Sequence, residues 1–268
     1  MSPRPFPTIA LLIAAPLTLD LAFIGLGAVF DYPDVLGEPG FTVLATFRAN
    51  QTAIVTWFCV LATAALTLAP LAVLIGRLER SASMRAAVGL GIAASLVQAV
   101  GLLRWPLLAP GLADRAAAEG PDSPAVQTFE TLGMVLGTAL GETLGYTLTA
   151  TWTVCVAFAL RGSLPRWFTA WALASAALIA TGVLAPLDNP LPGLANFLGY
   201  ILWSGWLLTF AVLLALGRHR QGQVANREVR IDARGARRLD NPPRKRAVVS
   251  AMNTTKLRIL RALCVVEV

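Results

Sequence analysis

The sequence is poor in histidine and cysteine, and these scarcities exclude several classes of site. The only histidine, His219, follows the last long apolar run, so those runs hold no imidazole for haem, for zinc or for a Ser-His dyad. The three cysteines, Cys59, Cys155 and Cys264, are expected at different depths and suggest no disulfide. The sequence therefore predicts no cofactor and no metal.

Acidic residues are also scarce in the apolar runs, which argues against two further classes of enzyme. An intramembrane aspartyl protease needs two facing aspartates, but Asp20 is the only aspartate in these runs. No DDxxD motif exists to hold magnesium on a diphosphate substrate. A membrane-embedded enzyme is therefore the least favoured class of function.

Apolar residues, in contrast, are abundant. They make up 56% of the 268 residues, charged residues make up 14%, and the mean hydropathy of +0.65 is typical of membrane proteins. Six continuous apolar runs are each long enough to cross about 30 Å of hydrocarbon at about 1.5 Å per helical residue, and they lack the alternation of a β-barrel. The predicted fold is an all-α, polytopic bundle of six transmembrane helices, at approximately residues 9–30, 53–75, 86–108, 132–160, 168–187 and 194–216.

The charge of the connections between the runs alternates along the chain. Basic residues gather at the N-terminus and in the second and fourth connections, at Arg4, Arg77, Arg80, Arg85, Arg161 and Arg166. The other connections are mainly acidic, so the positive-inside bias predicts that both termini are cytoplasmic. Arginine outnumbers lysine 20 to 2 and alanine is frequent, which suggests a GC-rich bacterial genome and hence the plasma (inner) membrane.

Residues 218–268 form a basic tail that we expect to be cytoplasmic and largely disordered. It has 13 basic and 4 acidic residues, whereas residues 1–217 have 9 and 11, so the net charge of +7 resides in the tail and predicts no nucleic-acid partner. Arg244, Lys245 and Arg246 are candidate contacts to anionic lipid headgroups, at about 1 kcal/mol per basic residue. The blander interpretation is a solvated tail that only enforces topology. The bilayer is the one predicted partner; a protein partner and a homo-oligomer stay open.

Three ionisable residues within the predicted helices are candidates for function, because each costs about 2.5–3.5 kcal/mol at mid-helix. Asp20 lies near the middle of the first helix. It could be a proton or cation site, or it could form a hydrogen bond between helices. Arg104 follows Arg85 by 19 residues and Glu142 precedes Arg161 by 19, on consecutive antiparallel helices. Both side chains should therefore lie at a similar depth near the outer side, and we predict an ion pair between them.

Glycines at intervals of four give the fourth predicted helix a stripe of small side chains: Gly133, Gly137, Gly141 and Gly145. Such a stripe lets two helix backbones approach closely. Packing within one bundle is the simplest interpretation. A homodimer seam and the wall of a conduction path are the alternatives.

Tryptophan and proline mark the predicted helix ends. Trp57, Trp105, Trp167 and Trp203 lie close to them, where interfacial anchors are usual. Pro121 and Pro124 precede a segment that could be helical over residues 127–160, about 50 Å. That length exceeds the bilayer, so we expect this segment to tilt or to begin as an interfacial helix.

Two stretches carry a resemblance to a known family. The first is G-L-x-R-W-P-x-L-x-P, from Gly101 to Pro110, and the second is G-E-x-x-G, from Gly141 to Gly145. With these motifs the chain resembles, over about residues 8–216, the bacterial six-helix integral-membrane family called domain of unknown function 4386. The resemblance implies the fold and no activity, and its recurrent Arg and Glu correspond to Arg104 and Glu142.

Three functions remain open. A structural or regulatory membrane protein with a polar site of Arg104 and Glu142 is favoured. The first alternative is a small-solute or proton-coupled transporter that uses Asp20 and Glu142, and the second is a membrane-embedded enzyme. A cavity that reaches both carboxylates would favour transport, whereas carboxylates satisfied by neighbouring side chains would favour a scaffold.

Overall fold

The protein is a bundle of six helices long and apolar enough to cross a membrane. The computed structural model describes the backbone of residues 6–184 and 190–239 and the side chains of 6–184 and 191–217. The six spans are Phe6–Phe30, Gln51–Ile75, Ala82–Leu107, Pro124–Leu160, Arg166–Leu184 and Leu191–Gly217. The described residues contain no strand, so the predicted all-α fold of a multi-pass membrane protein is confirmed.

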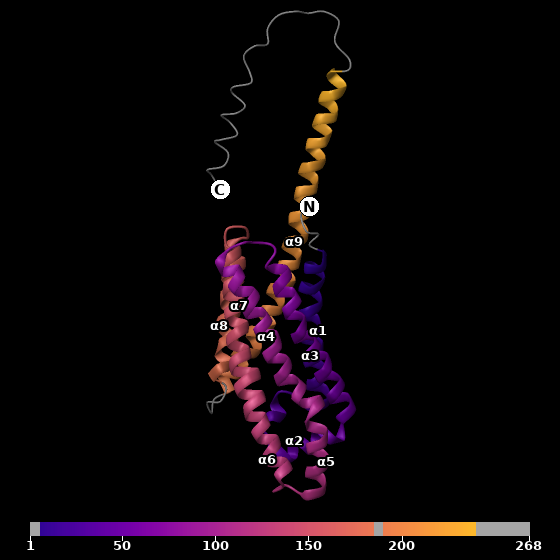
Figure 1. Ribbon diagram of the computed structural model, residues 1–268, viewed down its shortest axis with the longest axis vertical. Coiled ribbons are helices and arrows are strands. Elements are labelled where there is room, and N and C mark those ends of the chain that lie inside the picture. Colours follow the sequence, from indigo (N-terminus) through magenta and orange to yellow (C-terminus); the bar gives the residue numbers. More distant parts are fainter. Residues whose placement is uncertain (1–5, 185–189, 240–268) are drawn as a thin grey trace, which may run out of the picture. The chain divides into compact units, whose positions relative to one another are not determined.

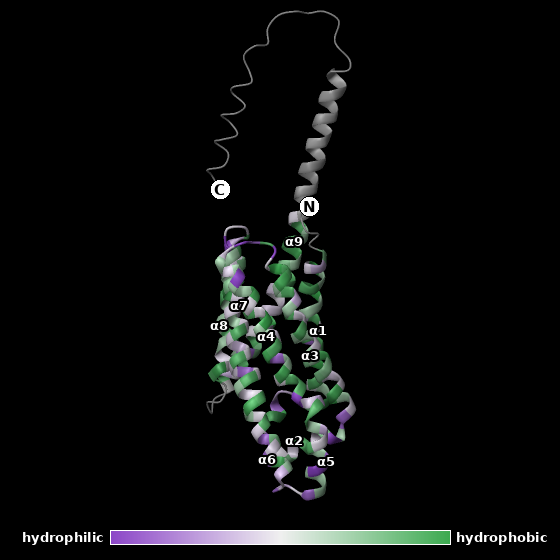
Figure 2. Ribbon diagram, viewed as in Figure 1, coloured by the Kyte–Doolittle hydropathy of each residue, from purple (hydrophilic) through white to green (hydrophobic). Residues whose placement is uncertain are grey.

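Five of the spans are continuous or nearly continuous α-helices (Figure 1). They are α1 (Phe6–Phe30), α3 (Gln51–Ile75), α4 (Ala82–Leu107), α8 (Arg166–Ala180), which the 3₁₀ turn η3 (Thr181–Leu184) extends, and the first part of α9 (Pro190–Leu239). Their outer surfaces are apolar: on α1, for example, Leu17, Leu21 and Ile24 expose 52, 55 and 70% of their surface. In Figure 2 the helices of the bundle are mainly hydrophobic, and the hydrophilic residues gather at the connections. Lipid is the solvent that such a surface requires.

The fourth span is built from three consecutive segments. They are α6 (Pro124–Leu132), the π-helix η2 (Gly133–Leu144) and α7 (Gly145–Leu160). Pro124 occupies the first turn of α6, where its missing N–H has no intrahelical partner to lose. The span therefore starts earlier than the predicted 132–160, and its middle is a π-helix, a rare form that often marks functional sites.

Three short helices form a cap at one end of the bundle (Figure 1). They are α2 (Gly40–Ala49), α5 (Ala109–Glu119) and α6, which contact one another. Each buries one stripe, such as Val43, Leu44 and Phe47 on α2. Gly120 lies in the turn between α5 and α6 and has a φ of 94°, a backbone conformation that residues with a Cβ rarely adopt. The sequence predicted a helical start for the segment that contains α6, but no helix at α2 or α5.

Two clusters of buried side chains make up the interior. The cap-side core surrounds Trp105 and joins the cap to the neighbouring ends of α1, α3 and α4. The bundle core lies among α1, α3, α4, α7, α8 and α9 (Pro190–Leu239) and is centred on Trp152 and Trp206. Two predicted interfacial tryptophans, Trp105 and Trp203, are 1 and 6% exposed in these cores, so the anchor prediction is wrong for them. A helix end covered by a folded cap is not an interface, which explains the error at Trp105.

The basic tail is described over its first part only. The backbone of residues 218–239 is helical and continues α9, in a unit that comprises residues 218–268. This stretch contains no proline, and extending a helix that already exists needs no new nucleus. The predicted lipid contacts Arg244, Lys245 and Arg246 lie outside the described residues.

Candidate polar site in the membrane bundle

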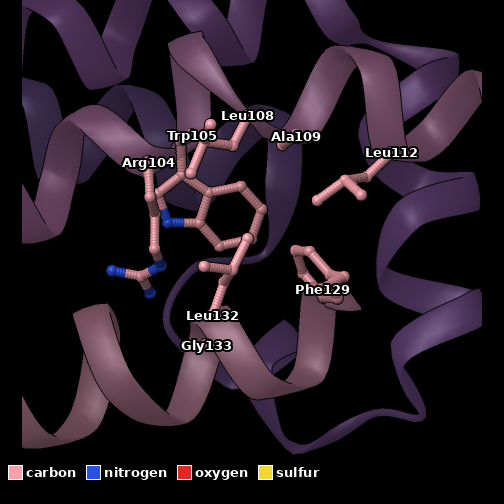
Figure 3. Close-up of a pocket in the computed structure, with 8 residues that line it drawn as sticks. All are labelled: Arg104, Trp105, Leu108, Ala109, Leu112, Phe129, Leu132 and Gly133. Atoms are coloured by element: carbon pink, nitrogen blue, oxygen red, sulfur yellow. The ribbon is translucent and has the colours of Figure 1, made fainter. Parts of the chain in front are cut away.

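Arg104 lies on α4 close to the cap, beside the buried Trp105 (Figure 3). Its Nη1 donates a hydrogen bond of 2.6 Å to the carbonyl oxygen of Gly101, one turn earlier on the same helix. Its guanidinium also lies against Gly137 of η2, where a Cβ would be 2.8 Å from Nη2. The Cζ atom is 5.3 Å from the centroid of the Trp105 ring, a cation–π distance. The Arg104 guanidinium, within a span, therefore has three kinds of neighbour. A backbone carbonyl accepts its hydrogen bond, the Trp105 ring lies beside it, and the absence of a side chain at Gly137 leaves space for it.

Glu142 lies on η2 and interacts electrostatically with Arg104. The two side chains do not form the predicted contact pair, because the only salt bridge among the described residues joins Arg48 to Asp114 in the cap. The reason is local: the guanidinium bonds to Gly101 and lies over Gly137, just over one turn before Glu142. Arg104 and Glu142 are therefore neighbours that interact electrostatically but form no salt bridge.

Two tyrosines complete the site. Tyr32, directly after α1, and Tyr146, at the start of α7, both interact electrostatically with Arg104 and Glu142. Tyr32 lies outside the membrane-spanning segments, and burial raises its pKa to about 12, against the opposing effect of Arg104. We call Tyr32, Arg104, Glu142 and Tyr146 the polar site. Sequence analysis missed both tyrosines, although Tyr146 follows Glu142 by four residues, a spacing that places side chains on one face of a helix.

The glycine stripe brings η2 and α7 against α4. A Cβ on Gly101 of α4 would be 2.9 Å from the Cα of Gly141, and a Cβ on Gly145 would be 3.0 Å from Gln98. Gly137 receives Arg104, as described above, whereas Gly133 has nothing within 4 Å. Three of the four glycines therefore face α4, and the stripe serves both close packing and the placement of Arg104.

Asp20 belongs to a different contact. The hydroxyl of Ser204 on α9 donates a hydrogen bond of 3.0 Å to Asp20 Oδ1, and Ser204 is only 3% exposed. Among the described side chains, no hydrogen bond or salt bridge joins Asp20 directly to Arg104 or Glu142. The structure thus uses Asp20 as a polar link between α1 and α9, near the middle of both spans.

The space around Arg104 is small. A pocket of about 10 Å³ is lined by Arg104, Trp105, Phe129 and Leu132 among others, and it has room for about one water molecule (Figure 3). The indole Nε1 of Trp105 is buried and has no hydrogen-bond partner among the described residues. No group of three or more His, Cys, Asp or Glu side chains in the described part of the chain is arranged to hold a metal.

Comparison with known proteins supplies a family. No curated protein and no solved structure matches the chain. A family described as a domain of unknown function, DUF4386, matches residues 10–211. This range holds all six spans in whole or large part, the cap, the glycine stripe and the polar site. The chain therefore belongs to the DUF4386 family, as the two sequence motifs suggested.

Proposed function

We propose that this chain is a structural or regulatory membrane protein in which the polar site couples the bundle to the cap. The observation that carries the proposal is the adjacency of Arg104 and Trp105 on α4. Trp105 is the centre of the cap-side core, whereas the Arg104 side chain lies across η2 of the bundle. Trp105 thus contacts the cap and Arg104 contacts η2 of the bundle. A regulatory protein of this kind would have to control the position of the cap relative to the bundle.

The contacts give this coupling a physical basis. The guanidinium fits only where Gly137 leaves space, so a shift or rewinding of η2 would displace Arg104. Arg104 is bonded to its own helix at Gly101, so the end of α4 would follow, and with it Trp105 and the ring of Phe47 on α2, 5.9 Å away. Small helix shifts at packed interfaces are a common form of switching.

For the topology, we propose that both termini are cytoplasmic and that the cap lies on the opposite side of a bacterial inner membrane. The distribution of arginine supports this orientation, because Arg77, Arg80, Arg85, Arg161 and Arg166 all occupy the end of the bundle remote from the cap. The basic tail, with Arg244, Lys245 and Arg246, remains the proposed contact to anionic lipid headgroups.

Hydrogen exchange of the cap in Arg104 variants tests the coupling. In Arg104→Gln, we expect faster exchange of the α2 and α5 amides than in the wild type, with less change in α8, because the cap loses its tie to η2. Arg48→Gln, which removes only the exposed salt bridge from α2 to α5, is the matched control and should have a smaller effect. Equal exchange of the cap in Arg104→Gln and in the wild type would contradict the proposal.

A proton-coupled or small-solute transporter is the second candidate. It is favoured by Glu142, whose carboxylate lies on a π-helix and accepts no hydrogen bond from the described residues. Flux into proteoliposomes under an imposed membrane potential separates the two candidates. Flux that is lost in Asp20→Asn or Glu142→Gln while the variants stay folded would favour transport, whereas absence of flux in every protein would favour the regulatory proposal.

A further inference from the structure

Asp20 lies on the side of α1 that the rest of the bundle leaves largely uncovered. The buried residues of this helix gather on the other side: Thr8, Leu12, Ala15, Pro16, Ala22, Gly25, Leu26 and Phe30. Ile13, Leu17 and Ile24 are exposed and follow one another with Asp20 at intervals of three and four residues, so the four share one stripe of the helix. Asp20 is itself partly exposed. We call Ile13, Leu17, Asp20 and Ile24 the α1 stripe.

The carboxyl group of Asp20 lies at a depth where lipid cannot solvate it. The span of α1 runs from Phe6 to Phe30, so Asp20 is about 21 Å from the first of these residues and about 15 Å from the second by helical rise. The hydrocarbon of a bilayer is about 30 Å thick, which places Asp20 near its middle. Lipid tails offer no hydrogen-bond donor and no positive charge at that depth.

The bundle provides a partner for only one oxygen of this carboxyl group. The Ser204 hydroxyl donates to Asp20 Oδ1 at 3.0 Å, and this is the only hydrogen bond of the Asp20 side chain among the described residues. The single salt bridge in the described part of the chain lies in the cap, so no basic side chain of that part pairs with Asp20. Arg104 bonds to Gly101 instead. An ionisable side chain inside a membrane usually has a partner, and here Oδ2 lacks one within residues 6–184 and 191–217.

The α1 stripe indicates what kind of group could supply the missing partner. A small cation would need several oxygen ligands, and no group of three or more His, Cys, Asp or Glu side chains in the described residues is arranged to hold one. A second copy of the chain in the same membrane would bring its own Asp20 to the same depth, as a like charge.

A transmembrane helix with a basic side chain meets both requirements of the α1 stripe. Its apolar residues would cover Leu17 and Ile24, whose spacing from Asp20 is that of a seam between two packed helices. Its lysine or arginine would bring the opposite charge and a hydrogen-bond donor to the depth of Asp20. Charged residues within membrane segments commonly pair with one another in this way.

We propose that the α1 stripe binds a transmembrane helix of another protein, and that a lysine or arginine of this helix pairs with Asp20 near the middle of the membrane. Ser204 positions the Asp20 carboxyl group through Oδ1 and leaves Oδ2 for the basic side chain. Leu17 and Ile24 contact apolar side chains of the partner helix on either side of the ion pair. This inference does not rest on the coupling of the bundle to the cap, although such a helix would give a regulatory protein a partner within the membrane.

Model transmembrane peptides test the proposal. The full chain and a leucine-rich helical peptide of about 20 residues carry a donor and an acceptor fluorophore, and energy transfer in lipid vesicles measures their association. The central residue of the peptide is lysine, or leucine in the control peptide. We expect the lysine peptide to bind about tenfold more tightly than the leucine peptide, as is typical of one polar contact between membrane helices. Equal affinities would overturn the proposal. Energy transfer between two labelled copies of the chain that is lost in Asp20→Asn would identify a second copy as the occupant and would also overturn it.

Two variants and one matched control locate the binding surface. In Asp20→Asn the lysine peptide should lose its advantage over the leucine peptide, because the negative charge is removed while the shape of the side chain is kept. Leu17→Trp changes no polar group, and its larger side chain, one turn from Asp20, should weaken binding of the lysine peptide. Leu96→Trp makes the same substitution on α4 at a position of similar exposure, 54% against 52%, and should bind this peptide as the wild type does.

Two results with these variants would contradict the proposal. One is an advantage of the lysine peptide that persists in Asp20→Asn. The other is a loss of binding in Leu96→Trp as large as in Leu17→Trp, a comparison that stays available if Asp20→Asn fails to fold. The cap exchange of Arg104→Gln is a separate readout, so either proposal can fail alone.

Discussion

The cap-side core and the bundle core are both built around tryptophan, yet they draw on different parts of the chain. In the cap-side core the Trp105 ring stacks on Phe58 at 4.8 Å and meets Phe30 edge-on at 5.1 Å. In the bundle core the Trp206 ring stacks on Phe168 at 5.2 Å. The first core takes part of its side chains from cap helices outside the spans, whereas the second takes all of them from the spans and the short connections at their ends.

This difference separates two sources of stability. Burial of apolar area from water contributes about 25 cal/mol per Å². We expect this contribution for the cap helices α2 and α5, which lie outside the spans. Between helices surrounded by lipid, this term is small, and packing and hydrogen bonds remain. The same aromatic geometry should therefore stabilise the cap-side core more than the bundle core.

The largest predicted effect follows from removing the two indoles. Trp105→Ala should destabilise the protein by about 3–5 kcal/mol, because it leaves a cavity and exposes cap side chains to water. Trp206→Ala should cost less, because its cavity lies among lipid-solvated helices. The free energy of unfolding of both variants can be measured in mild detergent by titration with a denaturing detergent. Equal losses of stability in the two variants would refute the predicted difference between the two cores.

How far the sequence predicts this structure follows from the same contrast. The six spans were predictable because a run of about 20 apolar residues has few other uses. The cap was not, because α2 presents only three or four buried positions, such as Val43 and Phe47, in a segment that also carries charge. Helical rise was enough to predict that Arg104 and Glu142 lie near each other. Their detailed arrangement depends on the π-helix η2 and on the space at Gly137, and neither can be predicted from the periodicity of the sequence.

Glycine substitutions give the next largest effect and sharpen the comparison within the bundle. In Gly101→Ala the new Cβ would be 2.9 Å from both the Cα of Gly141 and the carbonyl oxygen of Leu136, so α4 and η2 must move apart. We expect a loss of about 1–3 kcal/mol. Gly133→Ala is the matched control, since nothing lies within 4 Å of its Cβ position, and it should be neutral or stabilising by up to about 1 kcal/mol. A loss in Gly133→Ala as large as in Gly101→Ala would show that backbone freedom, and not close packing, explains these glycines.

The smallest effect tests how well the cap-side core excludes water. Tyr32 packs edge-on against Phe58 at 5.4 Å, and its pKa of about 12 exceeds the ordinary value of 10. Because the folded state favours the neutral phenol, the stability that Tyr32 contributes is complete below pH 10 and declines as the pH rises toward and through 12. Thermal unfolding of the wild type should therefore fall more steeply over this range than that of Tyr32→Phe, and an absorbance titration of the phenolate should lose one late component in the variant. If the two proteins lose stability in parallel, water reaches Tyr32 in the folded state, and the two cores differ less than their solvents suggest.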